Sequence, residues 1–445
     1  MVHIRIRTRT TTFAGALVAT ALLTAACTGS GGSAKGADAK APTDPKKVSG
    51  TITVLTHKTD LVQDGTMKRY ADEFNKIYPK VTVKFDAITD YEGEVKIRMN
   101  TENYGDVLMI PGVIPKADYP RFFASLGTEA ERSKKYRFTA FTTVGGKTYG
   151  QSPMGSIPGF TYNKKVWSQA GITKWPTTPA EFLADLKQIK TKTASIPYYT
   201  NFKDMWPMTA WTFANGSLSC DVQANNKLTT TDPWAKNGGE LRTVDTLLYD
   251  IVHDGYAEKD PTTTAWEASK TKLAKGQIAT MWLGSWATVQ MQGAAKSVGT
   301  NPDDIGFMPF PAQVDGKYCP VTSPDYNQAV NIHSAHKEAA RAWIDWFTDK
   351  SGYADSQLTI SPLKSAPLPA ILKPYEDAGV KFIELDQTKG AQVNAIDNES
   401  EIGLNKPDYR QDLVDIARGA KKQSLESFFA DLSKRWTAAQ KSAGQ

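Results

Sequence analysis

The pattern of hydrophobic and polar residues between positions 50 and 110 predicts a β-α-β-α-β unit. Apolar, β-branched segments predict strands at 51–56, 81–86 and 106–110. Two intervening segments carry apolar side chains at helical spacing and predict helices at 67–77 and 91–100. Strands joined by single helices form parallel sheets with right-handed crossovers, and wholly apolar strands are covered on both faces. We therefore expect this part of the chain to form a doubly wound α/β lobe.

Polar residues follow each of these predicted strands. In a doubly wound sheet, ligands bind beyond the carboxyl ends of the strands, which here are the loops 57–61, 86–91 and 111–115. The candidate ligand-binding residues in these loops are His57, Lys58, Asp60, Asp90 and Tyr91. Taken singly, each is explained equally well as an ordinary solvated loop residue.

The pattern changes after residue 160, where tryptophans and helices dominate. Eight of the eleven tryptophans lie between residues 160 and 290. Amphipathic patterns predict helices at 182–189, 241–252, 336–347, 410–421 and 424–439, and apolar runs predict strands at 305–311 and 327–332. A chain of 445 residues is too long for one ordinary core. We expect an α/β protein with two lobes, each a sheet flanked by helices.

The first residues predict export and lipid anchoring. Three arginines precede an uncharged apolar run that ends at Ala26, and a run of about 14 residues is too short to span ~30 Å of hydrocarbon. Cys27 follows Leu-Thr-Ala-Ala, which resembles the bacterial lipobox, where the cysteine is diacylated after cleavage. We expect residues 1–26 to be a lipoprotein signal peptide and residues 27–47 a flexible tether. The alternative is an ordinary signal peptide that leaves Cys27 free.

Composition and charge exclude several classes of protein. With 40% hydrophobic and 22% charged residues, the sequence is not that of a polytopic membrane protein. Removal of residues 1–26, which contain three arginines and no acid, lowers the formal net charge from +6 to +3. No basic stripe interleaved with aromatic residues is present, so nucleic acid is not an expected partner.

Two cysteines, Cys220 and Cys319, follow Cys27. In an extracytoplasmic compartment they can form a disulfide. Closing a loop of about a hundred residues would stabilise the fold by about 4–5 kcal/mol in the chain-entropy model. Two buried free thiols are the alternative.

The sequence offers no convincing catalytic or metal-binding motif. The segment GKT at 146–148 lacks the glycine that a phosphate-binding loop needs five positions earlier. GSIPG at 155–159 has proline where the helix of a nucleophile elbow should begin. His333 and His336 form the one close histidine pair, which is too few ligands for a zinc site. We expect no catalytic residue, no metal and no cofactor.

Three segments together resemble family 1 extracellular solute-binding proteins, the sugar-binding subunits of ABC importers. They are GDVLMIPG at 105–112, GFTYNKKVWSQAGITKWPTTPAEFLADLKQIK at 159–190 and KLAKGQIATMWLGSW at 272–286. The resemblance covers nearly all of residues 50–440. It implies a type II periplasmic-binding-protein-like fold with the ligand cleft between two hinged lobes. By similarity, the chain crosses near 151–156, 322–328 and 362–369, which gives an N-terminal lobe of 48–153 plus 328–365 and a C-terminal lobe of 154–327 plus 366–445.

The resemblance also implies site residues. In the family, the tryptophan that matches Trp286 lies against a sugar ring, and a flat indole suits the apolar C–H face of a pyranose. NFKDMWPMTAW at 201–211 resembles the segment that supplies another stacking aromatic, for which Trp206 is the candidate. Core packing is the alternative for Trp286 and for Trp282. The expected ligand-binding set is Trp286, Trp206, Trp282, Tyr91, Asp90, Asp60, Lys58, His57, Asp204 and Ser156.

The sequence therefore predicts an extracytoplasmic carbohydrate-binding protein. It would be a monomer, lipid-anchored to the bacterial cell membrane, and it would capture a mono- or oligosaccharide by hinge closure for an ABC permease. One alternative is an extracytoplasmic carbohydrate-active enzyme that uses a carboxylate pair such as Asp86 and Asp90. The other is a binding protein for a non-sugar solute such as a peptide or a polyamine. The stretch EIGLNKPDY at 401–409 lacks the tryptophan that the family places near the last helices, so the length of the sugar stays open.

Overall fold

The computed structural model describes residues 38–443, so the expected signal peptide and Cys27 lie outside the described residues. The first lobe is built on a five-stranded sheet with the order β2-β1-β3-β12-β4. Its strands are β1 (Ser49–Thr56), β2 (Lys80–Ala87), β3 (Val107–Met109), β12 (Gln328–Asn331) and β4 (Phe123–Ala124). Strand β1 pairs in parallel with β2 and β3, which confirms the predicted β-α-β-α-β unit. Strand β12 is antiparallel to β3 and β4 because the chain returns from the second lobe.

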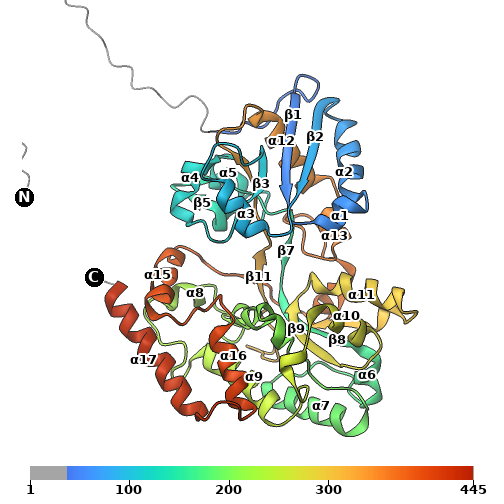
Figure 1. Cartoon of the computed structure of the whole chain (residues 1–445), viewed down its shortest axis with the longest axis vertical. Coiled ribbons are helices and arrows are strands. Elements are labelled where there is room, and N and C mark those ends of the chain that lie inside the picture. Colours follow the sequence, from blue (N-terminus) through green and yellow to red (C-terminus); the bar gives the residue numbers. More distant parts are fainter. Residues whose placement is uncertain (1–37, 444–445) are drawn as a thin grey trace, which may run out of the picture. The chain divides into compact units, whose positions relative to one another are not determined.

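Helices cover both faces of this sheet. Helices α2 (Thr66–Asn75) and α12 (Lys337–Asp349) pack on one face, and α3 (Tyr91–Arg98) packs on the other (Figure 1). Val54 in β1 points into the cluster of Phe74 and Trp343, whereas the adjacent Leu55 points into the cluster of Val95. This alternation is the period-2 geometry of a strand buried on both faces. A short helix, α1 (Thr59–Gln63), was not predicted and occupies the loop that follows β1.

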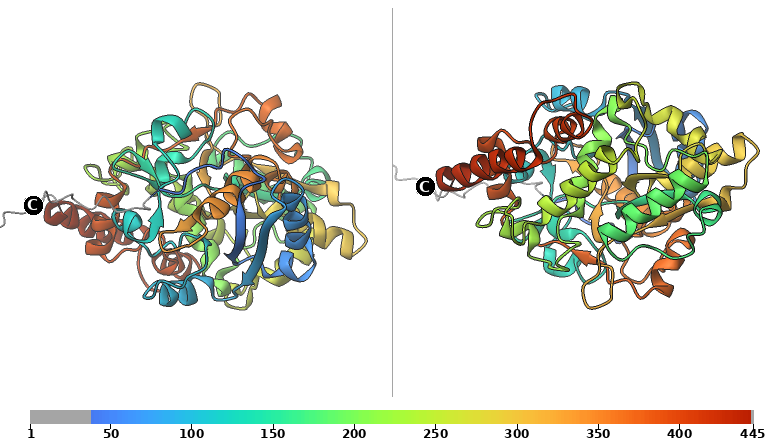
Figure 2. Two further views of the ribbon diagram at one scale, coloured as in Figure 1. Left: turned by 90° about the horizontal axis from the view of Figure 1, so that it is seen from above. Right: turned by 90° about the horizontal axis from the view of Figure 1, so that it is seen from below.

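The second lobe is built on a three-stranded antiparallel sheet with the order β10-β8-β9. Its strands are β8 (Pro158–Asn163), β9 (Thr280–Gly284) and β10 (Ile305–Met308). The surrounding helices are α6 (Lys164–Gln169), α7 (Pro179–Lys192), α9 (Glu240–His253), α10 (Trp266–Ala274), α11 (Ala287–Ser297), α15 (Gly390–Ser400), α16 (Asp408–Ala417) and α17 (Leu425–Ala443). Helix α17 lies at the edge of this lobe in both views of Figure 2. No helix within residues 38–443 combines the length and the apolar character needed to cross a bilayer.

Short strands join the two lobes. Strand β7 (Gly155–Ser156) pairs antiparallel with β11 (Val321–Pro324), and both lie between the two larger sheets in Figure 1. Strand β13 (Ile383–Glu384) pairs in parallel with β11. A third segment comes alongside at Ile360, which exchanges backbone hydrogen bonds of 2.7 and 3.0 Å with Gly155. The lobe boundaries that the resemblance implies stay a prediction.

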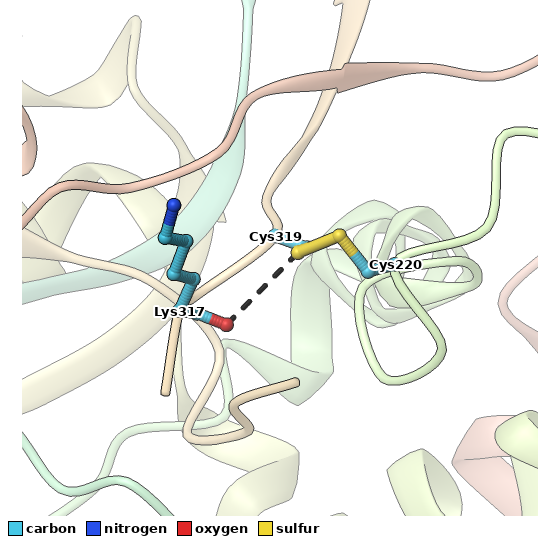
Figure 3. Close-up of a disulfide and its surroundings, with 3 residues drawn as sticks. All are labelled: Cys220, Lys317 and Cys319. Carbon is cyan, nitrogen blue, oxygen red and sulfur yellow. Dashed lines mark hydrogen bonds between the residues drawn. A yellow bond between two sulfur atoms is a disulfide. The ribbon is translucent and has the colours of Figure 1, made fainter. Parts of the chain in front are cut away.

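A disulfide joins Cys220 and Cys319, with the two sulfurs 2.02 Å apart and a sequence separation of 99 (Figure 3). Cys319 lies just before β11, and the carbonyl oxygen of Lys317 lies 3.9 Å from its sulfur. The bond ties a loop of the second lobe to the start of a strand that crosses between the lobes. The alternative of two free thiols does not describe this structure.

A buried ion pair joins two helices of the second lobe, α9 and α16. Arg410 of α16 and Asp245 of α9 are both fully buried, with Nε 2.8 Å from Oδ1. Asp245 also accepts a hydrogen bond of 2.9 Å from the Trp234 indole. The same arginine donates to the hydroxyl of Thr212, in the 3-10 helix η4 (Trp206–Ala214). Because a buried charge is tolerated only when paired, this network holds η4 against the helices beneath it.

Candidate functional site

Three tryptophans from separate elements meet on the second lobe. Trp206 begins η4, Trp266 begins α10 and Trp286 directly precedes α11. Their ring centroids are 5.4 Å (206 to 266), 5.8 Å (206 to 286) and 5.8 Å (266 to 286) apart. Trp206 is 37% exposed and the other two are half-buried. The rings are inclined to one another by 78°, 42° and 65° in the same order, and we call these three residues the three-tryptophan platform.

A strained loop presents Trp206. Asn201 and Met205 have positive φ values of 56° and 65°, and they flank a single turn of 3-10 helix. Non-glycine residues in this region carry a conformational cost and are enriched at functional sites. The Glu258 carboxylate holds the loop by accepting from the Thr200 backbone N–H, with both oxygens at 3.0 Å. From the other side, Gln411 of α16 donates to the Phe202 carbonyl at 3.1 Å.

Asp204 has a positioning role. Its carboxylate accepts a hydrogen bond from the backbone N–H of Trp266, the first residue of α10. A carboxylate at a helix N-terminus is favoured by the unpaired N–H groups and the helix dipole. Asp204 therefore joins the loop of Trp206 to the helix of Trp266. The sequence analysis did not select Trp266, although it counted this residue among the clustered tryptophans.

Gly284 makes room for Trp286. A Cβ atom at position 284 would lie 2.3 Å from Nε1 of Trp286 and 2.8 Å from Oγ of Ser156. The indole and the Ser156 hydroxyl therefore both approach the bare backbone at the end of β9. Ser156 also lies 3.4 Å, Oγ to Oγ, from Ser285. The structure brings together Trp286 and Ser156, two of the residues that the sequence selected.

Trp282 is a core residue, and its selection for the site was wrong. It is 2% exposed and packs against Phe160, Trp211 and Phe310, at centroid distances of 4.8, 5.3 and 5.7 Å. Its neighbours in β9, Met281 and Leu283, belong to the cluster against which Trp286 packs. Because side chains alternate along a strand, Trp282 faces the opposite side of the sheet.

In the first lobe, a set of polar and aromatic side chains lies next to the end of strand β11. The His57 ring lies 4.7 Å from that of Tyr326, centroid to centroid. Tyr326 donates from its hydroxyl to Glu92 at 2.7 Å, and Glu92 also accepts from the Gly112 N–H at 3.0 and 3.2 Å. Neither Tyr326 nor Glu92 was among the residues selected from the sequence. The signal for Tyr326 was its place within the second predicted crossing, residues 322–328.

Burial keeps His57 neutral. Desolvation, helped by the positive charge of Lys58, lowers the pKa of His57 to about 3. Its Nδ1 atom is buried and has no hydrogen-bond partner within residues 38–443. Lys58 also acts on Asp325, because burial raises the pKa of the Asp325 carboxyl and the lysine charge opposes that rise. The site thus offers an uncharged imidazole beside one lysine.

Tyr91 is structural, and its selection for ligand contact was wrong. It is 3% exposed, and its hydroxyl donates to the Met109 carbonyl at 3.0 Å and accepts from the Met109 N–H at 2.7 Å. The neighbouring Asp90 is exposed and caps α3 by accepting from the Gly93 N–H at 3.3 Å. Asp60 is exposed in the first turn of α1, and Lys58 is the residue that precedes that helix. Ligand contact by these three charged residues stays a prediction.

The tryptophans of the second lobe and the His57 group of the first lobe both lie near strand β11. Ser156, beside Trp286, is paired directly with Ser323 of β11. Tyr326, beside His57, follows Ser323 by three residues, so both groups of residues adjoin the segment around β11.

The carboxylates and histidines near the site have roles that can be described one by one. Within residues 38–443, no group of three or more His, Cys, Asp or Glu side chains is placed to hold a metal ion. Asp86, one of the carboxylates considered for an enzyme, forms an ion pair with Arg98, and its proposed partner Asp90 serves as a helix cap. What the arrangement offers is an aromatic surface with hydrogen-bonding groups at its edge.

Comparison with known proteins identifies the family. Residues 58–354 match the family model of the bacterial extracellular solute-binding proteins. The multiple sugar-binding protein of Streptococcus mutans serotype c (strain ATCC 700610 / UA159) is 23% identical over 316 residues, 67% of this chain and 71% of that protein. BlMnBP1, a binding protein of an ABC transporter from Bifidobacterium animalis subsp. lactis ATCC27673 solved with mannobiose, is 33% identical with a TM-score of 0.81, over 91% of this chain and 97% of that one.

A second solved structure from the same organism is similar to this chain to nearly the same degree. BlMnBP2, a manno-oligosaccharide specific solute-binding protein solved with mannotriose, is 32% identical with a TM-score of 0.81, over 89% of this chain and 96% of that one. This likeness confirms the two-lobe α/β fold of type II binding proteins that the resemblance implied. The chain belongs to the bacterial extracellular solute-binding proteins.

Proposed function

We propose that this protein binds a short oligosaccharide between its two lobes and delivers it to an ABC permease. The observation that carries the proposal is the three-tryptophan platform on one lobe, opposite the neutral His57 and the hydrogen-bonded Tyr326 on the other. An indole covers the apolar face of a pyranose, while hydroxyls at the ring edge bind polar side chains. The uncharged imidazole of His57 can exchange hydrogen bonds with ligand hydroxyls.

Manno-oligosaccharides of two or three units are the first ligands to test. The two similar structures that share about a third of their residues with this chain were solved with mannobiose and mannotriose. The ligand would be held by both lobes at once, and this is what favours a closed form over an open one. Capture is reversible and leaves the glycosidic bonds intact.

The remaining expectations concern how the protein is presented to its permease. We propose that it is a monomer outside the cytoplasmic membrane, anchored through a diacylated Cys27. The tether of residues 27–47 would let the two lobes reach the transporter while the lipid keeps the protein at the surface.

Calorimetric titration with mannobiose and mannotriose tests the proposal, using the mature chain and its Trp286→Ala variant. Removing an aromatic anchor from a desolvated contact should weaken binding by about 2 kcal/mol or more, which is about thirtyfold. Trp175→Ala is the matched control, since this half-buried tryptophan of the second lobe packs on Tyr318 and Tyr375 instead. Equal affinities for the wild-type and Trp286→Ala proteins would remove the platform from the site.

The same samples distinguish binding from catalysis. Oligosaccharides incubated with the protein should be recovered unchanged, and the appearance of shorter sugars would favour the carbohydrate-active enzyme. A thermal-shift screen that includes peptides and polyamines separates the third hypothesis, because only a true ligand raises the unfolding midpoint with its concentration.

A further inference from the structure

Met205 is exposed, whereas the other methionines within residues 38–443 are buried. Its side chain is 42% exposed, and each of the other eight is at most 6% exposed. The buried methionines are Met67, Met99, Met109, Met154, Met208, Met281, Met291 and Met308. Because an oxidant reaches a thioether only where the side chain is accessible, Met205 is the methionine that reacts first among these nine.

The backbone fixes Met205 at the surface. Its φ and ψ of 65° and −57° are close to those of the rare and strained kind of γ-turn. Its N–H donates to the Phe202 carbonyl at 3.1 Å, and its carbonyl accepts from the Met208 N–H at 2.9 Å. These hydrogen bonds hold the main chain on both sides of the residue. Met208 lies three residues later and is fully buried, so the same segment contains one accessible and one inaccessible thioether.

Met205 lies between two residues that form or position the three-tryptophan platform. It directly precedes Trp206, which is 37% exposed, so two large apolar side chains follow one another at the surface. It directly follows Asp204, whose carboxylate accepts from the N–H of Trp266. A chemical change at Met205 therefore falls within the loop that places two of the three tryptophans.

We propose that Met205 is a site of oxidation to methionine sulfoxide, and that the sulfoxide weakens sugar binding at the three-tryptophan platform, which rests on the function proposed above. Oxidation converts a flexible apolar side chain into a polar, chiral one. The sulfoxide oxygen binds water beside the indole of Trp206, and a sugar ring that covers this indole must displace that water at a cost. The Cys220–Cys319 disulfide is typical of an oxidising compartment, where peroxides can reach an exposed thioether.

The reaction needs a peroxide as oxidant and no other group of the protein. The sulfur lone pair attacks one oxygen of hydrogen peroxide, the S–O bond forms as the O–O bond breaks, and a proton shift releases water. The sulfur gives up an electron pair, and the peroxide is reduced. A methionine sulfoxide reductase that uses thiols reverses the step, which yields water and leaves the thiols as a disulfide.

Treatment of the mature chain with hydrogen peroxide tests the proposal, followed by peptide mapping by mass spectrometry and by calorimetric titration with mannotriose. Met205 should gain an oxygen at least about tenfold faster than Met208, which the fragment spectra distinguish from it. The affinity for mannotriose should fall at least about fivefold, in proportion to the oxidised fraction of Met205. Met205→Leu is the matched control, because leucine is similar in volume and has no sulfur. The affinity of this variant should be the same before and after peroxide.

Oxidation of Met208 as fast as that of Met205 would overturn the proposal. So would a mannotriose affinity that full oxidation of Met205 leaves unchanged, or one that peroxide lowers equally in the Met205→Leu protein. If Met205→Leu does not fold, the order of oxidation and the affinity of the partly oxidised wild-type protein still decide. Failure of the function proposed for the platform looks different, because untreated protein then does not bind mannotriose or binds it equally well with Trp286→Ala.

Discussion

The position of Trp286 depends on Gly284, which has no side chain. The indole occupies space beside the backbone of Gly284 that any Cβ would enter, and it does so next to the Ser156 hydroxyl. Trp282, two residues before that glycine, is sealed in the core. The number of tryptophans in the segment does not show which of the two is exposed. Side chains alternate along β9, so Met281 and Leu283 face the side where Trp286 packs, and Trp282 faces the other side.

Replacing Gly284 by alanine should therefore reduce ligand affinity. The added methyl group would lie 2.3 Å from Nε1 of Trp286, so the ring must turn away from its place. We expect mannotriose to bind at least about tenfold more weakly by calorimetry, which is about 1.4 kcal/mol. Gly293→Ala is the matched control, because nothing lies within 4 Å of its Cβ in α11. Unchanged affinity in both variants would show that the indole orientation does not matter for binding.

The pH response of His57 is a second residue-scale prediction. Its pKa is lowered to about 3 in the folded protein, against about 6.5 in an unfolded chain. The neutral ring stabilises the fold fully above the unfolded pKa, and this contribution is lost as the pH falls below it, because the unfolded chain binds the proton first.

NMR of the folded protein checks this directly. The His57 resonance, assigned by comparison with His57→Gln, should not titrate between about pH 5 and 8. Ligand affinity should show no step from this residue over the same range. A titration midpoint near its ordinary value would contradict the burial argument.

At the scale of elements, the strands of the first lobe could be predicted because burial on both faces leaves a continuous apolar signal. The segment 106–110 is an example, and its observed strand, β3, is fully buried. The short helix α1 could not be predicted, since its five residues carry no periodic signal and none is buried. Nor could the contact between Asp204 and Trp266 be predicted, because the two residues are 62 positions apart and meet only in the folded loop.

Part of the candidate site was nevertheless within reach of the sequence. Of the residues that the sequence selected, Trp286 lies beside Trp206 and beside Ser156 of β7, and ligand contact by these residues and by His57 stays a prediction. Tyr91 was misassigned because its ring direction depends on a hydrogen bond to Met109 in a neighbouring strand. Side-chain direction in a loop is set by tertiary contacts, which local pattern does not encode.

The disulfide gives an element-scale prediction about stability. The cystine closes a loop whose ends, Cys220 and Cys319, have a sequence separation of 99. In the chain-entropy model, the Cys220→Ser/Cys319→Ser variant should lose about 4–5 kcal/mol of unfolding free energy. Urea unfolding of both proteins, with the slopes compared, measures this difference. An equal midpoint and slope would show that the loop is held by other contacts.

On the scale of the whole molecule, the fold places two dissimilar surfaces on either side of one strand pair. The second lobe offers indoles and the first offers an imidazole, a phenol and a carboxylate. Strands β7 and β11 connect them over only a few residues, so a ligand that touches both surfaces also spans the junction of the lobes. Contacts that join two surfaces around one ligand would favour the closed form of the protein.

A crystal structure of the mature protein with mannotriose tests this account most directly. The account predicts a sugar ring against the faces of Trp286 and Trp206, with a hydroxyl of the same ligand hydrogen-bonded to His57, Tyr326 or Glu92 of the first lobe. A sugar bound away from these tryptophans, or a sugar found cleaved, would contradict it.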